Sequence, residues 1–325
     1  MLKPMTLRIL TLLAALLGAI ASASGEVYPT RAIRIVVPFG AGGPADVYAR
    51  AVAEGLQERF KQSVVVENRP GAGSVIGTGE AAKAAPDGYT LLMMSNTHTV
   101  NETLLPNKPF RLMRDFVPVA PVNFSDLVVV LHPSVPASDT QAFVALLKAK
   151  PGDFNYASSG PGTPYHMAGE LFKALTGTSI VHVPHRGSGE ARASVIGGHV
   201  QMMIDAVTTM APAVREGQVK ALGTTGLKRS AVLPDVPTIA ESGVPGYEAL
   251  IWLGLMAPAG TPPDIVTTLN GAIAEIVARP QTVAAWRQQG AEPMRMPPAE
   301  FEAFLHKDIE KWADLIKKAD IKVQR

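Results

Sequence analysis

The chain has 325 residues, of which 47% are hydrophobic, and its 30 lysines and arginines nearly balance its 28 aspartates and glutamates. This balance, without a clustered basic segment, argues against a nucleic-acid-binding protein. The sequence contains no cysteine, which excludes disulfides, thiolate metal sites and a cysteine nucleophile.

The first residues are typical of a secretory signal peptide. Lys3 and Arg8 precede an apolar run at residues 9–20, and Ala21-Ser22-Ala23 supplies an A-x-A cleavage site. A membrane anchor is the alternative, but the run is shorter than the roughly 20 residues that span a bilayer. We predict cleavage near Ala23 and a periplasmic protein whose mature part, residues 24–325, keeps 28 basic and 28 acidic side chains.

Strand-like and helix-like segments alternate after this signal. Strands are predicted at 33–37, 63–68 and 89–95, with helices at 44–60 and 74–85 between them. Such alternation predicts βαβ units and a mostly parallel sheet. Four prolines interrupt the pattern between 103 and 125, and we place a crossing into a second lobe there.

The alternation then repeats in the second lobe. Strands are predicted at 127–131, 154–159, 180–184, 200–205 and 220–225, and helices at 135–150, 163–177 and 188–198. A strand at 247–258 returns to the first lobe, and the C-terminal helices carry an apolar stripe of Phe301, Phe304, Leu305, Trp312, Leu315 and Ile316, which we expect to face the core. We therefore predict lobe 1 at 24–122 and 249–325, lobe 2 at 123–248, and a ligand cleft between them.

The stretch VVPFGAGGPADVYAR, residues 36–50, contains the first loop that could hold a ligand. It satisfies the G-x-G-x-x-G/A pattern of dinucleotide-binding proteins, and Glu67 could imitate their ribose-binding acid. Glycine lets a ligand approach the backbone, and the N–H groups of the following helix start attract an anion. Pro44 suits the first helical position, and Asp46 in the first turn would repel a diphosphate. The loop alone leaves a dinucleotide, another anion or a plain turn open.

Three further strand ends or loops present small polar residues. RPGAGSVIGTGEAA, residues 69–82, leads into a helix. The loop that ends the strand at 89–95 displays Ser95, Asn96, Thr97 and His98. ASSGPGTPYHMAGE, residues 157–170, places Ser158, Ser159 and Thr163 at a helix start in the second lobe. Backbone amides and small hydroxyls from two lobes would suit a carboxylate that is gripped without reacting.

In these motifs the sequence resembles the Bug-type periplasmic solute receptors of tripartite tricarboxylate transporters. The resemblance covers nearly all of the mature chain and includes YPTRAIRIVVPFGAGGPAD, VVVENRPGAGSVIG, DGYTLLMMS, DFVPVAPV, NYASSGPGTPYHMAGE, VPHRGSGEA, VQMMIDAV, LPDVPTIAESGVPGYE and WLGLMAPAGTP. It implies an α/β protein with a type II periplasmic-binding-protein fold, whose two lobes close on a small organic carboxylate. It also implies membrane permease subunits as partners, no cofactor, and a monomer.

The resemblance also implies which residues contact the ligand. By motif position these are Phe39, Gly40, Ala41, Gly43 and Asp46 in the first loop, Asn96 and Thr97 in the third, Ser158, Ser159 and Thr163 in the second lobe, and Asp205 at the end of VQMMID. Many relatives have an aromatic residue and a lysine where this chain has His185 and Arg186. Arg186 could grip a second carboxylate bidentately, or it could be an exposed structural arginine.

Two catalytic or metal-binding interpretations are less favoured. Ser159, His166 and Asp205 could form a hydrolase triad, but no G-x-S-x-G elbow surrounds Ser159. His182 and His185 could bind metal, but their spacing lies on a strand and no H-E-x-x-H accompanies them.

The leading hypothesis is a non-enzymatic receptor. An NAD-type oxidoreductase built on the glycine loop is the alternative from another class, and the signal peptide argues against it because exported proteins do not meet a cytosolic NAD pool. An exported sensory receptor that signals to a membrane kinase also fits the sequence. The identity of the ligand stays open, because several classes of compound share a carboxylate group. They are dicarboxylates, tricarboxylates, aromatic acids, acidic amino acids and nicotinate-like compounds.

Overall fold

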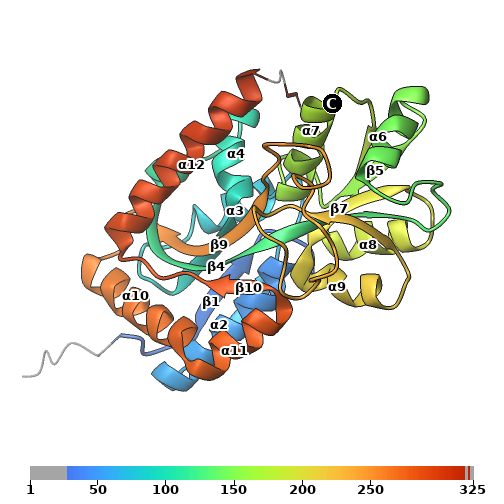
Figure 1. The fold of residues 1–325 in the computed structure, drawn as a ribbon. Coiled ribbons are helices and arrows are strands. Elements are labelled where there is room, and N and C mark those ends of the chain that lie inside the picture. Colours follow the sequence, from blue (N-terminus) through green and yellow to red (C-terminus); the bar gives the residue numbers. More distant parts are fainter. Residues whose placement is uncertain (1–27, 319–320, 323–325) are drawn as a thin grey trace, which may run out of the picture.

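The computed structural model describes residues 28–318 and 321–322. The predicted signal peptide and its cleavage site lie outside the described residues. Two α/β lobes lie side by side, one carrying the N-terminal strands and the C-terminal helices, the other the middle of the chain (Figure 1). Within the described part, no helix combines the length and the apolar character needed to cross a membrane.

Lobe 1 begins with three parallel strands, in the order β2-β1-β3. They are β1 (Ile33–Val37), β2 (Val64–Asn68) and β3 (Thr90–Ser95), and α2 (Pro44–Phe60), α3 (Val75–Ala81) and α4 (Asn96–Leu104) follow them in turn. The run IRIVV of β1 is rich in β-branched residues that suit a buried strand, and α2 begins at a proline that needs no N–H partner there. Each of these strands is therefore followed by a helix, through a loop after β1 and β2 and directly after β3.

The proline-rich segment is a strand rather than an irregular connection. After the short helix α5 (Leu112–Asp115), β4 runs for 16 residues from Phe116 to Leu131. Its register against β9 (Leu250–Pro258) shifts next to Pro118 and again next to Pro121. Proline cannot donate to the ladder, so the sequence pattern is broken at these positions while the neighbouring strand still holds β4 in place.

Strand β4 passes through both lobes. Its residues up to Asp126 pair with β9, and those from Leu127 pair with β7 (Met202–Ala206) and β8 (Lys220–Thr224). The second crossing lies beside the first: Leu127 N–H donates to Thr225 Oγ1 at 2.8 Å, and Ala249 N–H donates to the Thr225 carbonyl at 3.1 Å. These bonds join the two crossings into one hinge.

Lobe 2 repeats the arrangement of lobe 1. Strands β7, β5 (Asn155–Ser158) and β6 (Val181–Pro184) are parallel, and its helices are α6 (Thr140–Ala149), α7 (Pro164–Thr176), α8 (Ser188–Ile196) and α9 (Val207–Arg215). Strands β4, β8 and β9 run antiparallel to their neighbours. The sheets are therefore mixed rather than mostly parallel as expected. The reason is that the strands that pass between the lobes or end a lobe run in the opposite direction.

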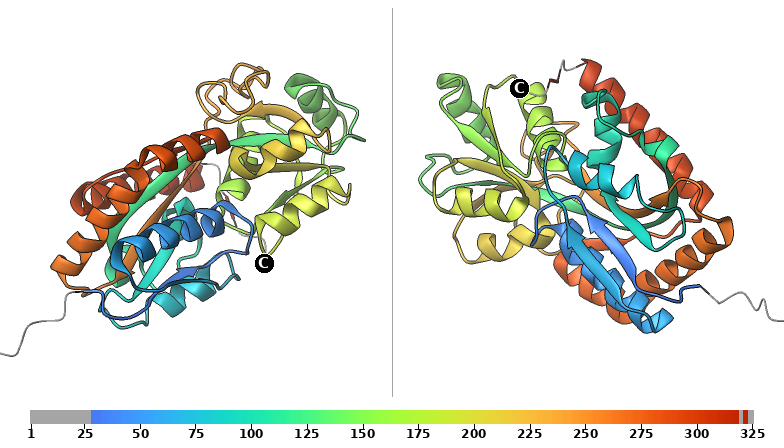
Figure 2. Two further views of the ribbon diagram at one scale, coloured as in Figure 1. Left: turned by 90° about the horizontal axis from the view of Figure 1, so that it is seen from below. Right: turned by 180° about the vertical axis from the view of Figure 1, so that it is seen from behind.

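The C-terminal part of the chain covers lobe 1. It contains α10 (Pro263–Ala278), α11 (Pro280–Gln289), β10 (Ala291–Pro293) and α12 (Pro298–Lys318). In α12 the residues Phe301, Leu305, Trp312 and Ile316 are buried, so the predicted core-facing stripe is confirmed. Figure 2 shows α12 and α10 on one lobe and the α6–α9 segment on the other, with strands continuing between them. One hydrophobic core, which includes Ile35, Leu127 and Phe172, extends through both lobes.

Candidate functional site

A small cavity, of about 20 Å³, lies where the two lobes meet. Lobe 1 contributes the loop before α2, the end of β3 and two residues of β9, and lobe 2 contributes the starts of α7 and α8. The lining residues are Phe39, Gly40, Gly43, Pro44, Ala45, Ser95, Ser159, Pro164, Tyr165, Ser188, Ile251 and Leu253. The cavity is thus built from both lobes and would exist only when they are together.

Four helices begin at this cavity. Gly43, Ser95 and Gly187 are the residues that precede α2, α4 and α8, and Pro164 is the first residue of α7. The first N–H groups of a helix have no partner within it and carry partial positive charge. No lysine, arginine, aspartate or glutamate of the described chain lines the cavity. The site can therefore attract an anion through helix starts and hydroxyl groups, without a charged side chain.

The glycine loop is shaped by Asp46 from within lobe 1. Gly42 has a φ of 76°, and its N–H donates to Asp46 Oδ2 at 3.0 Å. Arg50 Nε donates to the other oxygen at 3.0 Å. Burial tends to raise the pKa of Asp46, but these hydrogen bonds outweigh it and hold the pKa below its usual range. Asp46 therefore holds the loop in place and leaves the cavity to Gly40 and Gly43.

The lobes approach each other closely where Gly187 faces Gly40. A Cβ atom on Gly187 would lie 3.0 Å from Gly40 Cα, and one on Gly43 would lie 2.7 Å from Ser188 Oγ. Gly187 and Gly43 both have extended backbone that any residue adopts. Glycine is needed at these positions because of the opposite lobe and not because of the local backbone.

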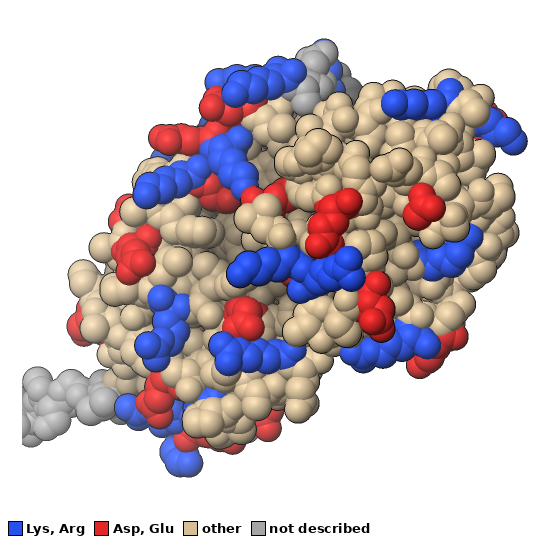
Figure 3. All heavy atoms as spheres, in the orientation of Figure 1, with Lys and Arg blue, Asp and Glu red and all other residues tan. Residues whose placement is uncertain are grey.

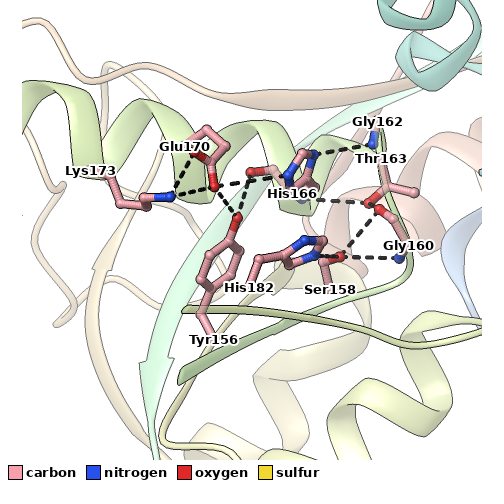
Figure 4. A network of polar contacts seen from close by, with 9 residues as sticks. All are labelled: Tyr156, Ser158, Gly160, Gly162, Thr163, His166, Glu170, Lys173 and His182. Atoms are coloured by element: carbon pink, nitrogen blue, oxygen red, sulfur yellow. Dashed lines mark hydrogen bonds and ion pairs between the residues drawn. The ribbon is translucent and has the colours of Figure 1, made fainter. Parts of the chain in front are cut away.

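The loop before α7 is held by a polar network inside lobe 2 (Figure 4). Ser158 Oγ is 2.6 Å from His182 Nε2, and the Gly160 N–H donates to the same Ser158 oxygen at 3.1 Å. Thr163 Oγ1 donates to the Gly160 carbonyl at 2.7 Å and accepts the His166 N–H at 3.5 Å. Ser158 and Thr163 thus shape the loop, and Ser159 between them lines the cavity.

A buried histidine, His166, and a half-buried one, His182, belong to this network. The rings of His166 and His182 lie 4.2 Å apart, and the Gly162 N–H donates to His166 Nδ1 at 3.2 Å. Burial lowers the pKa of His182 to about 3, helped by His166 and Lys173, and burial lowers the pKa of His166 to about 4. His98 in lobe 1, also buried, has its pKa lowered to about 4 for the same reason. All three imidazoles are neutral at pH 7.

We expect the free energy of unfolding to fall as the pH decreases from about 6.5 towards 4. In that interval the unfolded histidines take up protons while His98, His166 and His182 stay neutral in the folded state, so acid favours unfolding. Each histidine contributes at most about 1.4 kcal/mol per pH unit. Urea unfolding at pH 7, 6 and 5 measures the slope, and His182→Gln should make it shallower. An unchanged slope in His182→Gln would contradict this account.

In the third loop, Ser95 faces the cavity, whereas Asn96 and Thr97 do not line it. Ser95 lines the cavity, whereas Thr97 is buried, and its N–H donates to Ser95 Oγ at 3.2 Å. Asn96 Nδ2 donates to the Leu250 carbonyl at 2.9 Å, and Asn96 lines a separate pocket on the other side of β9. Successive residues at a strand end point to opposite faces of the sheet, which places Ser95 and Asn96 on different sides.

Asp205 lies behind the cavity wall and is paired with an arginine. It is fully buried, and Arg192 Nε donates to its Oδ2 atom at 3.0 Å. Burial raises the pKa of Asp205 above its usual range in spite of Arg192 and Thr209, which act in the opposite direction. Tyr165, which does line the cavity, interacts electrostatically with both members of this pair.

Of the predicted residues, Phe39, Gly40, Gly43 and Ser159 line the cavity, and Arg186 lines an adjoining hollow that shares Phe39 and Ser159 with it. Ala41, Asp46, Asn96, Thr97, Ser158, Thr163 and Asp205 do not appear in the cavity wall of the described structure. The main residues that the sequence analysis missed are Tyr165, Ser188, Ile251 and Leu253. For Ser188 a signal existed, because HRGSGEA repeats the pattern of a strand, a glycine and a helix start.

The structure does not assemble the alternative sites among the residues it describes. His166 bonds to Gly162 and Asp205 to Arg192, so the suggested triad with Ser159 is not formed. Within the described ranges, no group of three or more histidine, cysteine or acidic side chains is arranged to hold a metal ion. Glu67, the suggested ribose ligand, is held by Arg34 at 3.3 Å and Arg69 at 3.2 Å.

Comparison with known proteins places this chain among periplasmic receptors. A family model described as "Tripartite tricarboxylate transporter family receptor" matches residues 48–321. BugT of Bordetella pertussis is 38% identical over 309 residues, which cover 94% of this chain and 95% of that protein.

Two solved structures from Rhodopseudomonas palustris have the same fold. Rpa4515 with adipate is 33% identical, with a TM-score of 0.88 over 91% of this chain and 99% of that chain. MatC with bound malate is 31% identical, with a TM-score of 0.85 over 89% of this chain and 100% of that chain. The predicted fold of a periplasmic binding protein is confirmed.

Proposed function

Because this chain belongs to the receptor family of the tripartite tricarboxylate transporters, we propose that it binds one small organic carboxylate in the periplasm and delivers it to the membrane subunits of such a transporter. The observation that carries the proposal is the cavity at which four helices begin and which no charged side chain lines in the described structure. Relatives with the same fold hold adipate and malate, which supports a carboxylate as the ligand.

In this proposal the residues of the site have two roles. Phe39, Gly40, Gly43 and Ser159 would contact the ligand, together with Ser95 and Ser188 from the other two helix starts. Other predicted residues would hold the contacting residues in position. Asp46 would act by binding Gly42, and Ser158 and Thr163 by binding Gly160. Asp205 would act through its ion pair with Arg192 and its electrostatic interaction with Tyr165. Ala41, Asn96 and Thr97 lie further from the cavity, and Arg186 at its mouth is placed to meet a second charge of a longer ligand.

The cavity walls also indicate what surrounds the carboxylate of the ligand. Tyr165, Ile251 and Leu253 contribute apolar surface to the same wall. A second carboxylate buried against these side chains would lose its hydration without gaining a cation. We therefore propose a ligand with one enclosed carboxylate and an apolar body, and a monomeric, non-enzymatic receptor whose site comes from a single chain. We also propose that the signal peptide is cleaved near Ala23 and that the lobe boundaries lie near residues 122 and 248.

We expect at least one organic acid to raise the melting temperature clearly. For a dissociation constant on the order of 10 μM, a ligand at about 1 mM stabilises the folded state by roughly 2.7 kcal/mol. In a chain of this size that corresponds to a shift of roughly 5 to 10 °C. A thermal-shift screen of mono-, di- and tricarboxylates measures it, and mass spectrometry should recover the compound unchanged. A shift with NADH and none with any acid would favour the oxidoreductase instead.

A further inference from the structure

A second pocket, of about 270 Å³, lies on the opposite side of strand β9 from the ligand cavity. Ile251 and Leu253 of β9 line the ligand cavity, and Leu250 and Trp252 line the second pocket. Alternate residues of a strand point to opposite faces, so β9 separates the two spaces. The second pocket is bounded by α12 and the hinge, on the face drawn in Figure 3, where acidic and basic side chains are interspersed.

Aromatic rings make up much of the wall of this pocket. They are Phe124 from β4, Trp252 from β9, and Phe304 and Trp312 from α12. Trp252 and Phe304 stand edge to face with centroids 5.1 Å apart, so the surface is fixed by ring packing. Phe124 remains 36% exposed, which is unusual for a ring in a strand and keeps one side of the pocket open.

Two carboxylates line the same pocket, and neither forms an ion pair with a described lysine or arginine. They belong to Glu248 at the hinge and to Asp308 of α12, which accepts the Thr99 hydroxyl at 2.5 Å. Lys311 is the basic residue of the wall and lies over the outer ring of Trp312 at 5.9 Å. Burial raises the pKa of Asp308, and burial together with the charge of Glu248 raises the pKa of neighbouring Asp126 to about 6. The wall therefore carries two acidic side chains and one basic side chain.

A buried amide oxygen adds a further acceptor. Asn96 is 2% exposed and lines the pocket; its Nδ2 donates to the Leu250 carbonyl, whereas its Oδ1 meets no donor within the described structure. A buried acceptor without a donor is costly, and a ligand N–H would satisfy it. Aromatic faces attract organic cations, and carboxylates pair with them. We infer that this pocket is a second binding site, for a small organic ammonium ion whose apolar part lies against Trp252 and Trp312.

The experiment is a fluorescence titration of the mature protein with 2-phenylethylammonium. Two of the three tryptophans of the chain line the pocket, and Trp286→Phe removes the third, so the signal reports on this site. We expect a saturable change with a dissociation constant of about 1 mM or lower, which is attainable for a ligand of this size. Uncharged 2-phenylethanol should bind more weakly by about fivefold, as expected for the loss of a partly exposed charge pair.

Variants locate the site. Glu248→Gln and Asp308→Asn should each weaken the ammonium about fivefold. Glu310→Gln is the matched control, because Glu310 is exposed on the same helix and outside the pocket wall. Unchanged circular dichroism of each variant shows that it is folded. The inference is overturned if the ammonium gives no saturable signal, if the alcohol binds equally well, or if both acidic variants bind like the Glu310→Gln control.

Discussion

Replacing Gly187 with valine is expected to abolish the stabilisation of this protein by its carboxylate ligand. A Cβ atom at this position would lie 3.0 Å from Gly40 Cα and 3.4 Å from Gly40 N, and both of these are backbone atoms of the opposite lobe. A change of rotamer cannot relieve contacts with the backbone, so the lobes would have to separate. The helix starts of α2 and α8 would then no longer act on the same carboxylate, and the shift of about 5 to 10 °C should be lost.

The unliganded protein should keep its stability in this variant. Gly187 has a φ of −170°, which valine adopts without strain, so the obstacle exists only when the lobes are closed. Gly43→Val in the facing loop should reduce the shift less, because its Cβ would lie 2.7 Å from Ser188 Oγ, a side-chain atom that a change of rotamer can move. Gly271→Val in α10 is the control, since a Cβ there meets nothing within 4 Å. A full ligand-induced shift in both loop variants would refute closure at these glycines.

Replacing Arg192 with methionine is expected to lower the free energy of unfolding by about 3 kcal/mol at pH 8. Asp205 is fully buried, and its Oδ1 atom has no hydrogen-bond partner in the described structure, so Arg192 is its main compensation. Thr209, whose hydroxyl donates to Oδ2 at 3.3 Å, would be left as a neutral partner. A buried carboxylate without a cation loses its hydration without an equivalent gain, which destabilises the folded state.

The loss should depend on pH in a defined direction. Because the pKa of Asp205 is raised in the folded protein, the folded state binds a proton more readily, and stability from this group falls as the pH rises. Without Arg192 the pKa of Asp205 rises further. The difference in the free energy of unfolding between wild type and variant should therefore be smaller at pH 5 than at pH 8. Protonation of the buried histidines changes the stability of wild type and variant equally, so it does not contribute to this difference.

Urea unfolding of both proteins at the two pH values measures this effect. Arg287→Met is the control, since Arg287 pairs at 3.0 Å with Glu292 on the surface, where 62% and 46% of the two side chains are exposed. Loss of this surface ion pair should lower the free energy of unfolding by less than about 1 kcal/mol. Asp205→Asn added to Arg192→Met should recover part of the stability. Equal losses in the two arginine variants would contradict the account.

The order of the elements could be predicted from the sequence to a large extent. Strands such as IRIVV and helices such as the one that begins at Pro44 have strong local signals, and they appear where expected. The first part of strand β4, residues 116–126, was not predicted, because Pro118 and Pro121 remove N–H donors and only pairing with β9 makes this segment a strand. The apolar stripe of α12 was predicted because its helical spacing is visible in the sequence.

The loops of the candidate site were predicted, but their orientation was not. The sequence by itself determined the glycine and serine loops before helices, the absence of cysteine chemistry, and a family resemblance in ordered motifs. Only the tertiary structure decided that Ser95 faces the cavity and Asn96 the opposite pocket, that Ser158 bonds to His182, and that Asp46 turns back to Gly42. The physical reason is that local sequence fixes which backbone shape a loop adopts, whereas the direction of each side chain depends on burial and on partners that come from distant strands and the other lobe.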